Sequence, residues 1–258
     1  MTCIEKPSRF LMHSLPVLMA LGMITSPILN AATTPLNDTG VDLCGNNAAI
    51  KLDCPQPSHP GQDADFGRDA QAKAGKLKKM GAGHAGFDFT KLDHNGKTLP
   101  TTAKKWRCVL DNHTGLMWEV KTTGNGLRQM DHSYSWYMSD SKLNGGAPGV
   151  KNGGKCTGSR CDTEGYIEAI NKLELCGHKD WRLPLLEELR SIVDYSRAFP
   201  AIDLNYFPNT RSDPYWGREI WVKRKGRDVY SINFGSGKGR YIHRDRADVR
   251  IRLVRDGQ

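Results

Sequence analysis

The cysteines constrain this chain more than any other feature of its sequence. Seven are present, and the six beyond residue 31 are Cys44, Cys54, Cys108, Cys156, Cys161 and Cys176. An even number of cysteines in an exported chain predicts disulfides. The pairs that the spacing favours are Cys44 with Cys54, Cys156 with Cys161 and, by remainder, Cys108 with Cys176. Other connectivities stay open at this stage. Zinc is the alternative, but no C-x-x-C pair exists and the histidines are scattered, so we expect no metal site.

The first residues have the layout of a secretory signal peptide. Lys6 and Arg9 precede an apolar stretch over residues 10–28, and small residues follow around Ala31. Proline and glycine interrupt the apolar stretch, which favours cleavage over a permanent anchor. We therefore predict a signal peptide over residues 1–31 and no membrane span after its cleavage. The expected location is the periplasm, the cell surface or the extracellular space.

Positive charge is concentrated near the C-terminus. The formal charge is +9, and removal of Glu5, Lys6 and Arg9 with the signal peptide leaves +8. Residues 211–258 contain thirteen Lys or Arg and six Asp or Glu, which is almost all of this excess. Such a region favours sulfates, phosphates or carboxylates as partners. Nucleic acid would also suit a basic region, but export argues against it as a physiological partner.

The chain divides into an extension and a packed domain. Residues 32–100 are rich in Gly, Asp, Asn, Lys and Pro and have few large apolar residues, which predicts a loop-rich extension. Near its end, "GFDFTKLDHNGKTLP" alternates apolar and polar residues before Asn95-Gly96, so a small hairpin is expected there. The packed domain is expected over residues 101–258.

The pattern within residues 101–258 predicts two short helices among short antiparallel strands, an α+β fold. "WRCVL" and "LMWEV" have the composition of strands, and "DNHTG" that of the turn between them. Asp162 or Thr163 can cap one helix, and Pro184 suits the first turn of another. "EIWV", "VYSINF" and "VRIRLVR" predict strands towards the end, with a glycine-rich turn over residues 235–239.

Several of these motifs occur in the order typical of one family. "CVLDNHTGLMWEVKT", "YSWY", "LCGHKDWRLPLLEELRSIVDY", "AIDLNYFPNT" and "RIRLVR" resemble the family named for the C-terminal domain of the bacterial collagen-like adhesin Lcl. The resemblance covers about residues 106–258. It implies a C-type-lectin-like fold and, for most members, no established activity. The adhesin itself binds sulfated glycosaminoglycans, although kinship of fold does not transfer that function.

The sequence departs from this family where a ligand surface is expected. Members usually have serines after the Tyr-Trp pair, whereas Gly217 and Arg218 follow Trp216 here, and "GREIWVKRKGRD" is unusually basic. We therefore predict a binding surface for anionic polysaccharide, in which Arg contacts acidic groups and aromatic rings stack on sugars. Its predicted residues are Arg218, Lys223, Arg224, Lys225, Arg227, Lys238, Arg240, Arg244, Arg246, Trp216, Trp221 and Tyr241. The alternative is a solvated basic surface that only maintains solubility.

The sequence gives no constellation for catalysis. In "DWRLPLLEEL", Arg182 beside Glu187 or Glu188 lacks a nucleophile or metal, so we interpret this junction as structural, with Arg182 bound to carbonyls or a carboxylate. Isolated Asp-Asn turns suggest calcium as a ligand, but they lack a recognised calcium-loop pattern. We expect a non-enzymatic binding or adhesion module without a cofactor. The alternatives are an envelope structural or protein-interaction domain and, with less support, an oxidase of the lectin-like fold. Oligomeric state cannot be inferred.

Overall fold

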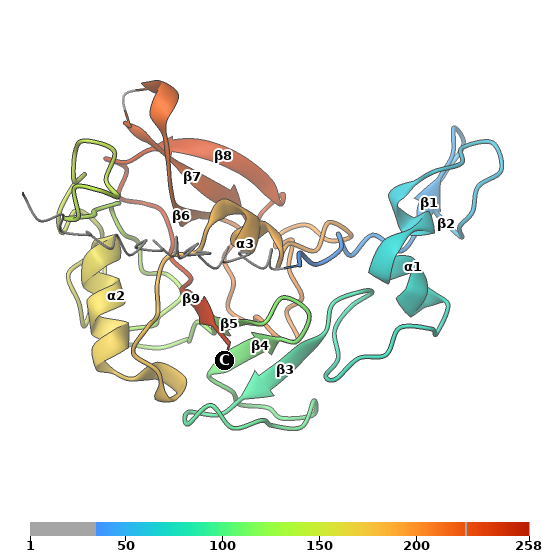
Figure 1. The fold of residues 1–258 in the computed structure, drawn as a ribbon, viewed down its shortest axis with the longest axis horizontal. Coiled ribbons are helices and arrows are strands. Elements are labelled where there is room, and N and C mark those ends of the chain that lie inside the picture. The colour runs from blue at the N-terminus through green and yellow to red at the C-terminus, as the bar shows by residue number, and fades with distance from the viewer. Residues whose placement is uncertain (1–34, 225, 258) are drawn as a thin grey trace, which may run out of the picture. The chain divides into compact units, whose positions relative to one another are not determined.

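A computed structural model describes residues 35–224 and 226–257, so the predicted signal peptide lies outside the described residues. Within them, short helices accompany three antiparallel sheets (Figure 1). The predicted α+β class is therefore confirmed. In the described part of the chain, no helix is long and apolar enough to cross a membrane.

The largest sheet is buried on both faces. Its strands, in spatial order, are β3 (Phe89–Leu92), β4 (Cys108–Asp111), β5 (Leu116–Glu119) and β9 (Val254–Asp256). Val109 opposes Trp118 within one hydrophobic cluster, whereas Met117 points into a second cluster. Because successive side chains in a strand alternate between faces, the nearly continuous apolar run "LMWEV", in which Glu119 is also buried, fits a strand covered on both sides. The two predicted strands and their turn are confirmed.

The sheet takes in residues from the predicted extension. Phe87 and Phe89 are almost fully buried, and their rings stack with centroids 5.3 Å apart. After β3 the chain turns at Asn95-Gly96, where Gly96 has a φ of 80°. An antiparallel bridge from Leu92 to Thr98 closes the predicted hairpin. The hydrophobic core thus begins at least fifteen residues before the family-like region.

The remaining part of the extension contains short elements. They are β1 (Cys44–Gly45), β2 (Ile50–Leu52), η1 (Asp63–Asp65) and α1 (Gly67–Lys73). The buried carboxylate of Asp69 accepts hydrogen bonds from the backbone N–H groups of Gly40, at 2.8 Å, and Gly86, at 2.6 Å. Asp69 thereby connects α1 to the chain on both sides of it.

A second sheet contains β6 (Pro214–Trp221), β7 (Asp228–Asn233) and β8 (Lys238–His243), with η3 (Val222–Arg224) after β6. The sequence analysis does not predict β8, because the glycines at 235, 237 and 239 together indicate a turn. In the structure the turn ends at Gly237, which has a φ of 70°, and Gly239 lies within β8 opposite Ile232. A side chain at Gly239 would contact the side chains of Arg190 and Leu186, which lie over this strand.

The C-terminal segment is less regular than predicted. "VRIRLVR" forms a ladder only from Val254 onward; before it, isolated bridges join Val249 to Tyr134 and Arg250 to Tyr215. The segment therefore extends the largest sheet only at its end and contacts β6 of the second sheet before that. The alternation is still as predicted, because the side chains of Val249, Ile251 and Leu253 lie in the second hydrophobic cluster.

Two predicted helices are present. In α2 (Thr163–Lys172) the side chain of Asp162 accepts a 2.7 Å hydrogen bond from Gly165 N–H, so Asp162 is the N-cap. The second helix, α3 (Leu186–Arg190), is short, and Leu189 points into the core. Between them, η2 (Leu175–Gly177) leads back to the sheet.

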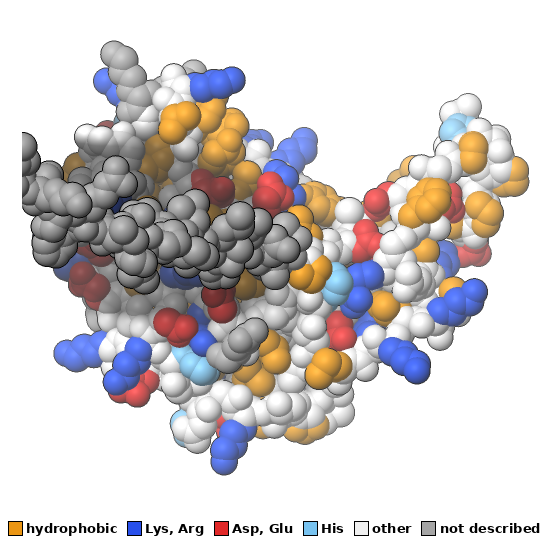
Figure 2. All heavy atoms as spheres, viewed as in Figure 1, with side chains coloured by type: hydrophobic (Ala, Val, Ile, Leu, Met, Phe, Trp, Pro, Cys, Tyr) orange, Lys and Arg blue, Asp and Glu red, His pale blue; other side chains and the backbone are white. Residues whose placement is uncertain are grey.

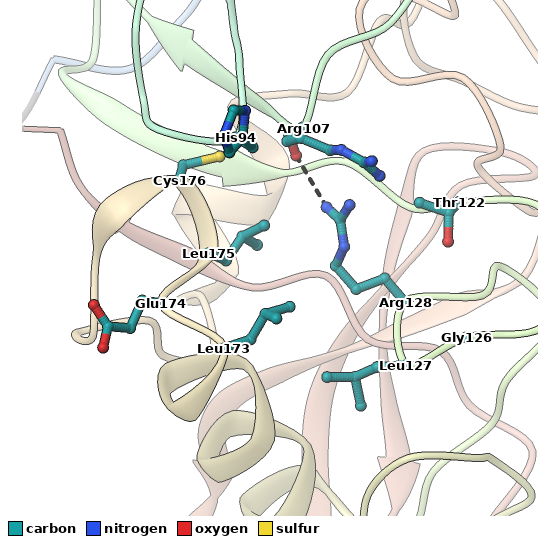
Figure 3. Close-up of a pocket in the computed structure, with 10 residues that line it drawn as sticks. All are labelled: His94, Arg107, Thr122, Gly126, Leu127, Arg128, Leu173, Glu174, Leu175 and Cys176. Carbon is teal, nitrogen blue, oxygen red and sulfur yellow. Dashed lines mark hydrogen bonds between the residues drawn. The ribbon is translucent and has the colours of Figure 1, made fainter.

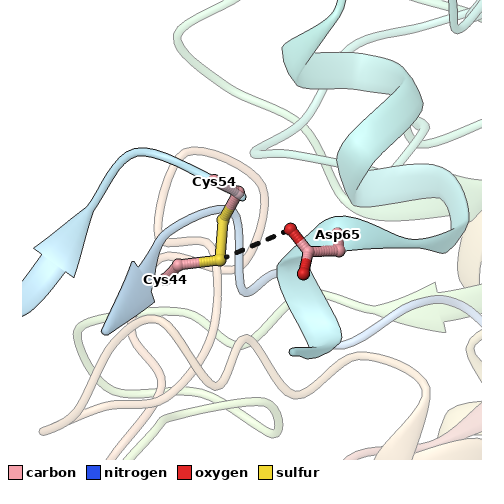
Figure 4. A group of neighbouring side chains, drawn as sticks. All are labelled: Cys44, Cys54 and Asp65. Carbon is pink, nitrogen blue, oxygen red and sulfur yellow. Dashed lines mark hydrogen bonds between the residues drawn. A yellow bond between two sulfur atoms is a disulfide. The ribbon is translucent and has the colours of Figure 1, made fainter. Parts of the chain in front are cut away.

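All three predicted disulfides are present. Cys108–Cys176 joins β4 to η2 across a sequence separation of 68, and Cys156–Cys161 closes a short loop. Cys44–Cys54 lies beside Asp65 (Figure 4), with Cys44 Sγ 3.6 Å from the carboxylate. These sulfurs are bonded to each other, so they are not available as thiolate ligands for a metal ion.

Candidate binding surface

The register of the second sheet separates the predicted ligand residues. Tyr230 opposes Tyr241 on one face, and Trp221 lies on that same face. Ser231 opposes Arg240 on the reverse face. The rings of Trp221 and Tyr241 and the cations of β8 therefore lie on opposite faces of the sheet.

Aromatic rings form a partly exposed group on the first of these faces. The rings of Trp221 and Tyr241 are stacked, with centroids 4.2 Å apart and planes 21° apart. The ring centroids of Tyr230 and Tyr241 lie 4.4 Å apart, and their hydroxyl oxygens are 2.9 Å apart. Tyr241 is 45% exposed, which is high for a tyrosine already packed on two sides. Such a ring can contact a sugar without unfolding of its surroundings.

Cations follow Trp221 along the chain. Lys223 and Arg227 are exposed on the connection from β6 to β7, and Arg218 is half-buried on β6. Within the described residues, the side chains of these three residues form no ion pair. Arg224 and Lys225, also predicted, lie outside the described side chains. We call Trp221, Lys223, Arg227, Tyr230 and Tyr241 the aromatic–cation surface; Figure 2 shows hydrophobic and basic side chains together over this end of the sheet.

Two predicted ligand residues are structural, which corrects the sequence interpretation. Trp216 is fully buried, and its Nε1 donates a 2.9 Å hydrogen bond to the carbonyl of Tyr134. Arg244 is 4% exposed and donates to the carbonyls of Asn144, at 3.1 Å, and Ala147. Neither side chain can reach a polysaccharide, because the indole fills the core and the guanidinium holds a loop in place.

The other predicted cations lie apart from the aromatic rings. Lys238 and Arg240 are exposed on the reverse face of β8. Arg240 and Arg246 line a cavity of about 340 Å³ there, to which Tyr241 also contributes from β8. Arg246 is bound to Asp248, with 2.8 Å between Nε and the carboxylate. The predicted ligand residues therefore lie on two surfaces instead of one. On the second surface, Asp248 already compensates the charge of Arg246.

A buried charged cluster was not predicted. Glu119 is fully buried, and its Oε1 lies 3.1 Å from Lys121 Nζ and accepts a hydrogen bond from the hydroxyl of Tyr166. Burial would raise the pKa of Glu119, but Lys121 and Arg128 hold that pKa below its ordinary value. Burial lowers the pKa of Lys121 to about 8 despite the opposite charge of Glu119. Arg252 donates to the Glu119 carbonyl at 2.5 Å.

The Trp-Arg-Leu-Pro junction is structural, as predicted. Arg182 forms a bidentate pair with Glu188, with both N–O distances 2.7 Å. The same carboxylate accepts a hydrogen bond from Leu185 N–H at the start of α3, at 2.7 Å. Arg182 also exchanges backbone hydrogen bonds with Val254. The junction thus fixes the start of a helix and the last strand of the sheet.

A second basic region lies elsewhere on the domain and was also not predicted. Lys104, Lys105 and Arg107 are exposed around a cavity of about 470 Å³ that Trp106 also lines. Trp106 is held by a 2.9 Å hydrogen bond to the carbonyl of Tyr206. A cluster of lysines in a polar loop gives no periodic signal, so only the tertiary structure brings these residues together.

Carboxylates gather at one further place. Oxygen atoms of Asp38, Asp63 and Asp69 lie within 4.8 Å of one another. Burial raises the pKa of Asp69, and its oxygens already accept backbone hydrogen bonds. This arrangement supports a hydrogen-bonding role for Asp69, so the cluster is not by itself evidence for calcium.

These features define a disulfide-bonded α+β domain with an exposed group of aromatic and basic side chains. Residues 107–255 match the family described as the Lcl C-terminal domain. The match covers more than half of the chain, and the chain belongs to that family. No curated protein and no solved structure gives a significant match. Membership associates the domain with an adhesin, while the C-type-lectin-like fold stays a prediction.

Proposed function

We propose that this protein is an exported, non-enzymatic binding module of lectin-like fold that holds an anionic polysaccharide at the aromatic–cation surface. The observation that carries the proposal is the stack of the half-buried Trp221 on the exposed Tyr241, beside cations that have no acidic partner within the described residues. Pyranose rings pack against aromatic faces, and sulfate or carboxylate groups accept hydrogen bonds from Arg and Lys.

Two further observations support binding over catalysis. The six cysteines of the described residues are consumed in disulfides, whereas an oxidase that uses a free cysteine needs a thiol. The acid at the centre of the buried cluster, Glu119, is fully buried and bound to Lys121 and Tyr166. A general base must instead lie within reach of a substrate proton.

Heparin affinity tests the proposal directly. We expect an alanine variant of Lys223 and Arg227 to elute from a heparin column at clearly lower salt than the wild type. The matched control replaces Lys78 and Lys97, which are exposed elsewhere, and removes the same charge. Retention of the control should fall much less. Both variants lose the same net charge and are screened by salt in the same way, but only the first loses contacts at the proposed binding surface. Equal retention of the two variants would remove this surface from the proposal.

A further inference from the structure

A separate cavity of about 420 Å³ lies between the end of α2 and the loop after β5 (Figure 3). One side of it is apolar, formed by Leu127, Leu173, Leu175 and the Cys176 end of a disulfide. Leu173 follows directly after α2 and is 56% exposed, although a leucine of the neighbouring turn, Leu175, is buried. The cavity thus has an apolar wall that is open to a ligand.

A buried guanidinium forms part of the opposite wall. Arg128 is 7% exposed, and Figure 3 shows its side chain extending along the cavity towards Arg107. Nη1 donates to the carbonyls of Arg107, at 3.1 Å, and Val120, at 2.9 Å. Within the described residues, Nη2 and Nε of Arg128 have no hydrogen-bond partner. A guanidinium has five N–H donors, so Arg128 can accept a further ligand without losing its structural bonds.

The charges behind this wall are not balanced. Lys121, Arg128 and Arg252 are each at least nine-tenths buried, and Glu119 is the carboxylate that they share. Burial lowers the pKa of Arg128, and Glu119 opposes that effect only in part. Buried charges without a counter-charge are costly, so an anion in the cavity would be stabilised.

The rim strengthens this preference for an anion. Arg107 is exposed beside the cavity and forms no side-chain ion pair within the described residues. Glu174, which also lines the cavity, is paired with Lys179 at 2.8 Å. Its negative charge is therefore already compensated and does not cancel that of Arg107.

We propose that this cavity binds a small amphipathic carboxylate. The carboxylate would accept hydrogen bonds from Arg128 and Arg107, and a branched apolar tail would pack against Leu173 and Leu175. The volume lies within the range of small-molecule sites, roughly 300–1,000 Å³. Such a ligand is either a free acid or the carboxyl-terminal residue of a peptide. This site does not depend on the aromatic–cation surface, so heparin retention and ligand binding here can fail separately.

Methyl-resolved NMR titration of the full chain tests the proposal with defined probes. We expect 4-methylvalerate to shift the methyl resonances of Leu127, Leu173 and Leu175 in a saturable way. Affinity should fall at least about tenfold for acetate, which lacks the tail, and for 4-methylpentan-1-ol, which lacks the charge. N-acetyl-leucine is the second arm: tighter binding than 4-methylvalerate assigns a peptide terminus, and weaker binding assigns a free acid. Equal binding of the acid and the alcohol would overturn the proposal.

Variants locate the site independently of the probe. Arg128→Lys keeps the positive charge but loses the paired N–H donors of the guanidinium. Arg107→Gln and Leu173→Ser change exposed side chains. Each should weaken 4-methylvalerate binding at least about fivefold. The matched controls Lys78→Gln and Leu204→Ser, at exposed positions outside the cavity, should leave it unchanged. If Arg107→Gln and Leu173→Ser both bind like the wild type, the site is not here, whether or not Arg128→Lys folds.

Discussion

Removing the disulfide between Cys108 and Cys176 should destabilise the domain more than removing the one between Cys156 and Cys161. Their sequence separations are 68 and 5. In the chain-entropy treatment, the stabilisation rises with the logarithm of the closed loop, which gives about 4 kcal/mol for the first and about 2 kcal/mol for the second. Cys108 and Cys176 are also fully buried, so alanine at both positions leaves a void that costs roughly 1 kcal/mol more.

The assay is urea unfolding of the full chain and the two double-alanine variants, followed by tryptophan fluorescence and linear extrapolation. We predict that the Cys108→Ala/Cys176→Ala variant loses about 2 to 3 kcal/mol more free energy of unfolding than the Cys156→Ala/Cys161→Ala variant. Equal losses, or a larger loss in the second variant, would refute the reasoning from loop length and burial. A melting temperature that does not change with reducing agent would contradict the role of disulfides altogether.

Three other predictions concern charge and the binding surface. Glu119→Gln leaves Lys121 without its buried counter-charge and should cost about 3 to 5 kcal/mol in urea unfolding; a loss under 1 kcal/mol would be inconsistent with the buried cluster. Asp194 raises the pKa of His84 by accepting its hydrogen bond. The stability from this pair is therefore complete below about pH 6 and lost as pH rises through the raised pKa. His84→Gln should accordingly destabilise more at pH 5.5 than at pH 9, and an equal cost at both would count against it. Trp221→Ala should weaken heparin retention with little change in melting temperature, whereas unaltered retention would argue against stacking.

Local signals in the sequence were sufficient for several elements. Asp162 lies just before an amphipathic run, and N-caps are determined by neighbouring residues, so α2 begins where predicted. Cys156 and Cys161 are close in sequence, so their pairing required no knowledge of the fold.

Other features depend on tertiary contacts that no local pattern contains. Trp216 and Trp221 are both indoles on β6, yet the first is fully buried and the second only half-buried. Arg244 looked like its basic neighbours, but a distant loop supplies the carbonyls that bind it. The cluster around Glu119 joins β5, α2 and the last strand, so its partners are far apart in sequence. Charge counting found the basic region but not the faces into which it divides.

The central claim is that the aromatic–cation surface is where an anionic polysaccharide binds. Backbone amide shifts of the ¹⁵N-labelled protein, titrated with a heparin hexasaccharide at low and at high salt, test it most directly. We predict saturable shifts at Trp221, Lys223, Arg227 and Tyr241 that weaken steeply as salt increases. Shifts confined to Lys104, Lys105 and Arg107, or no saturable shifts at either salt concentration, would contradict the account.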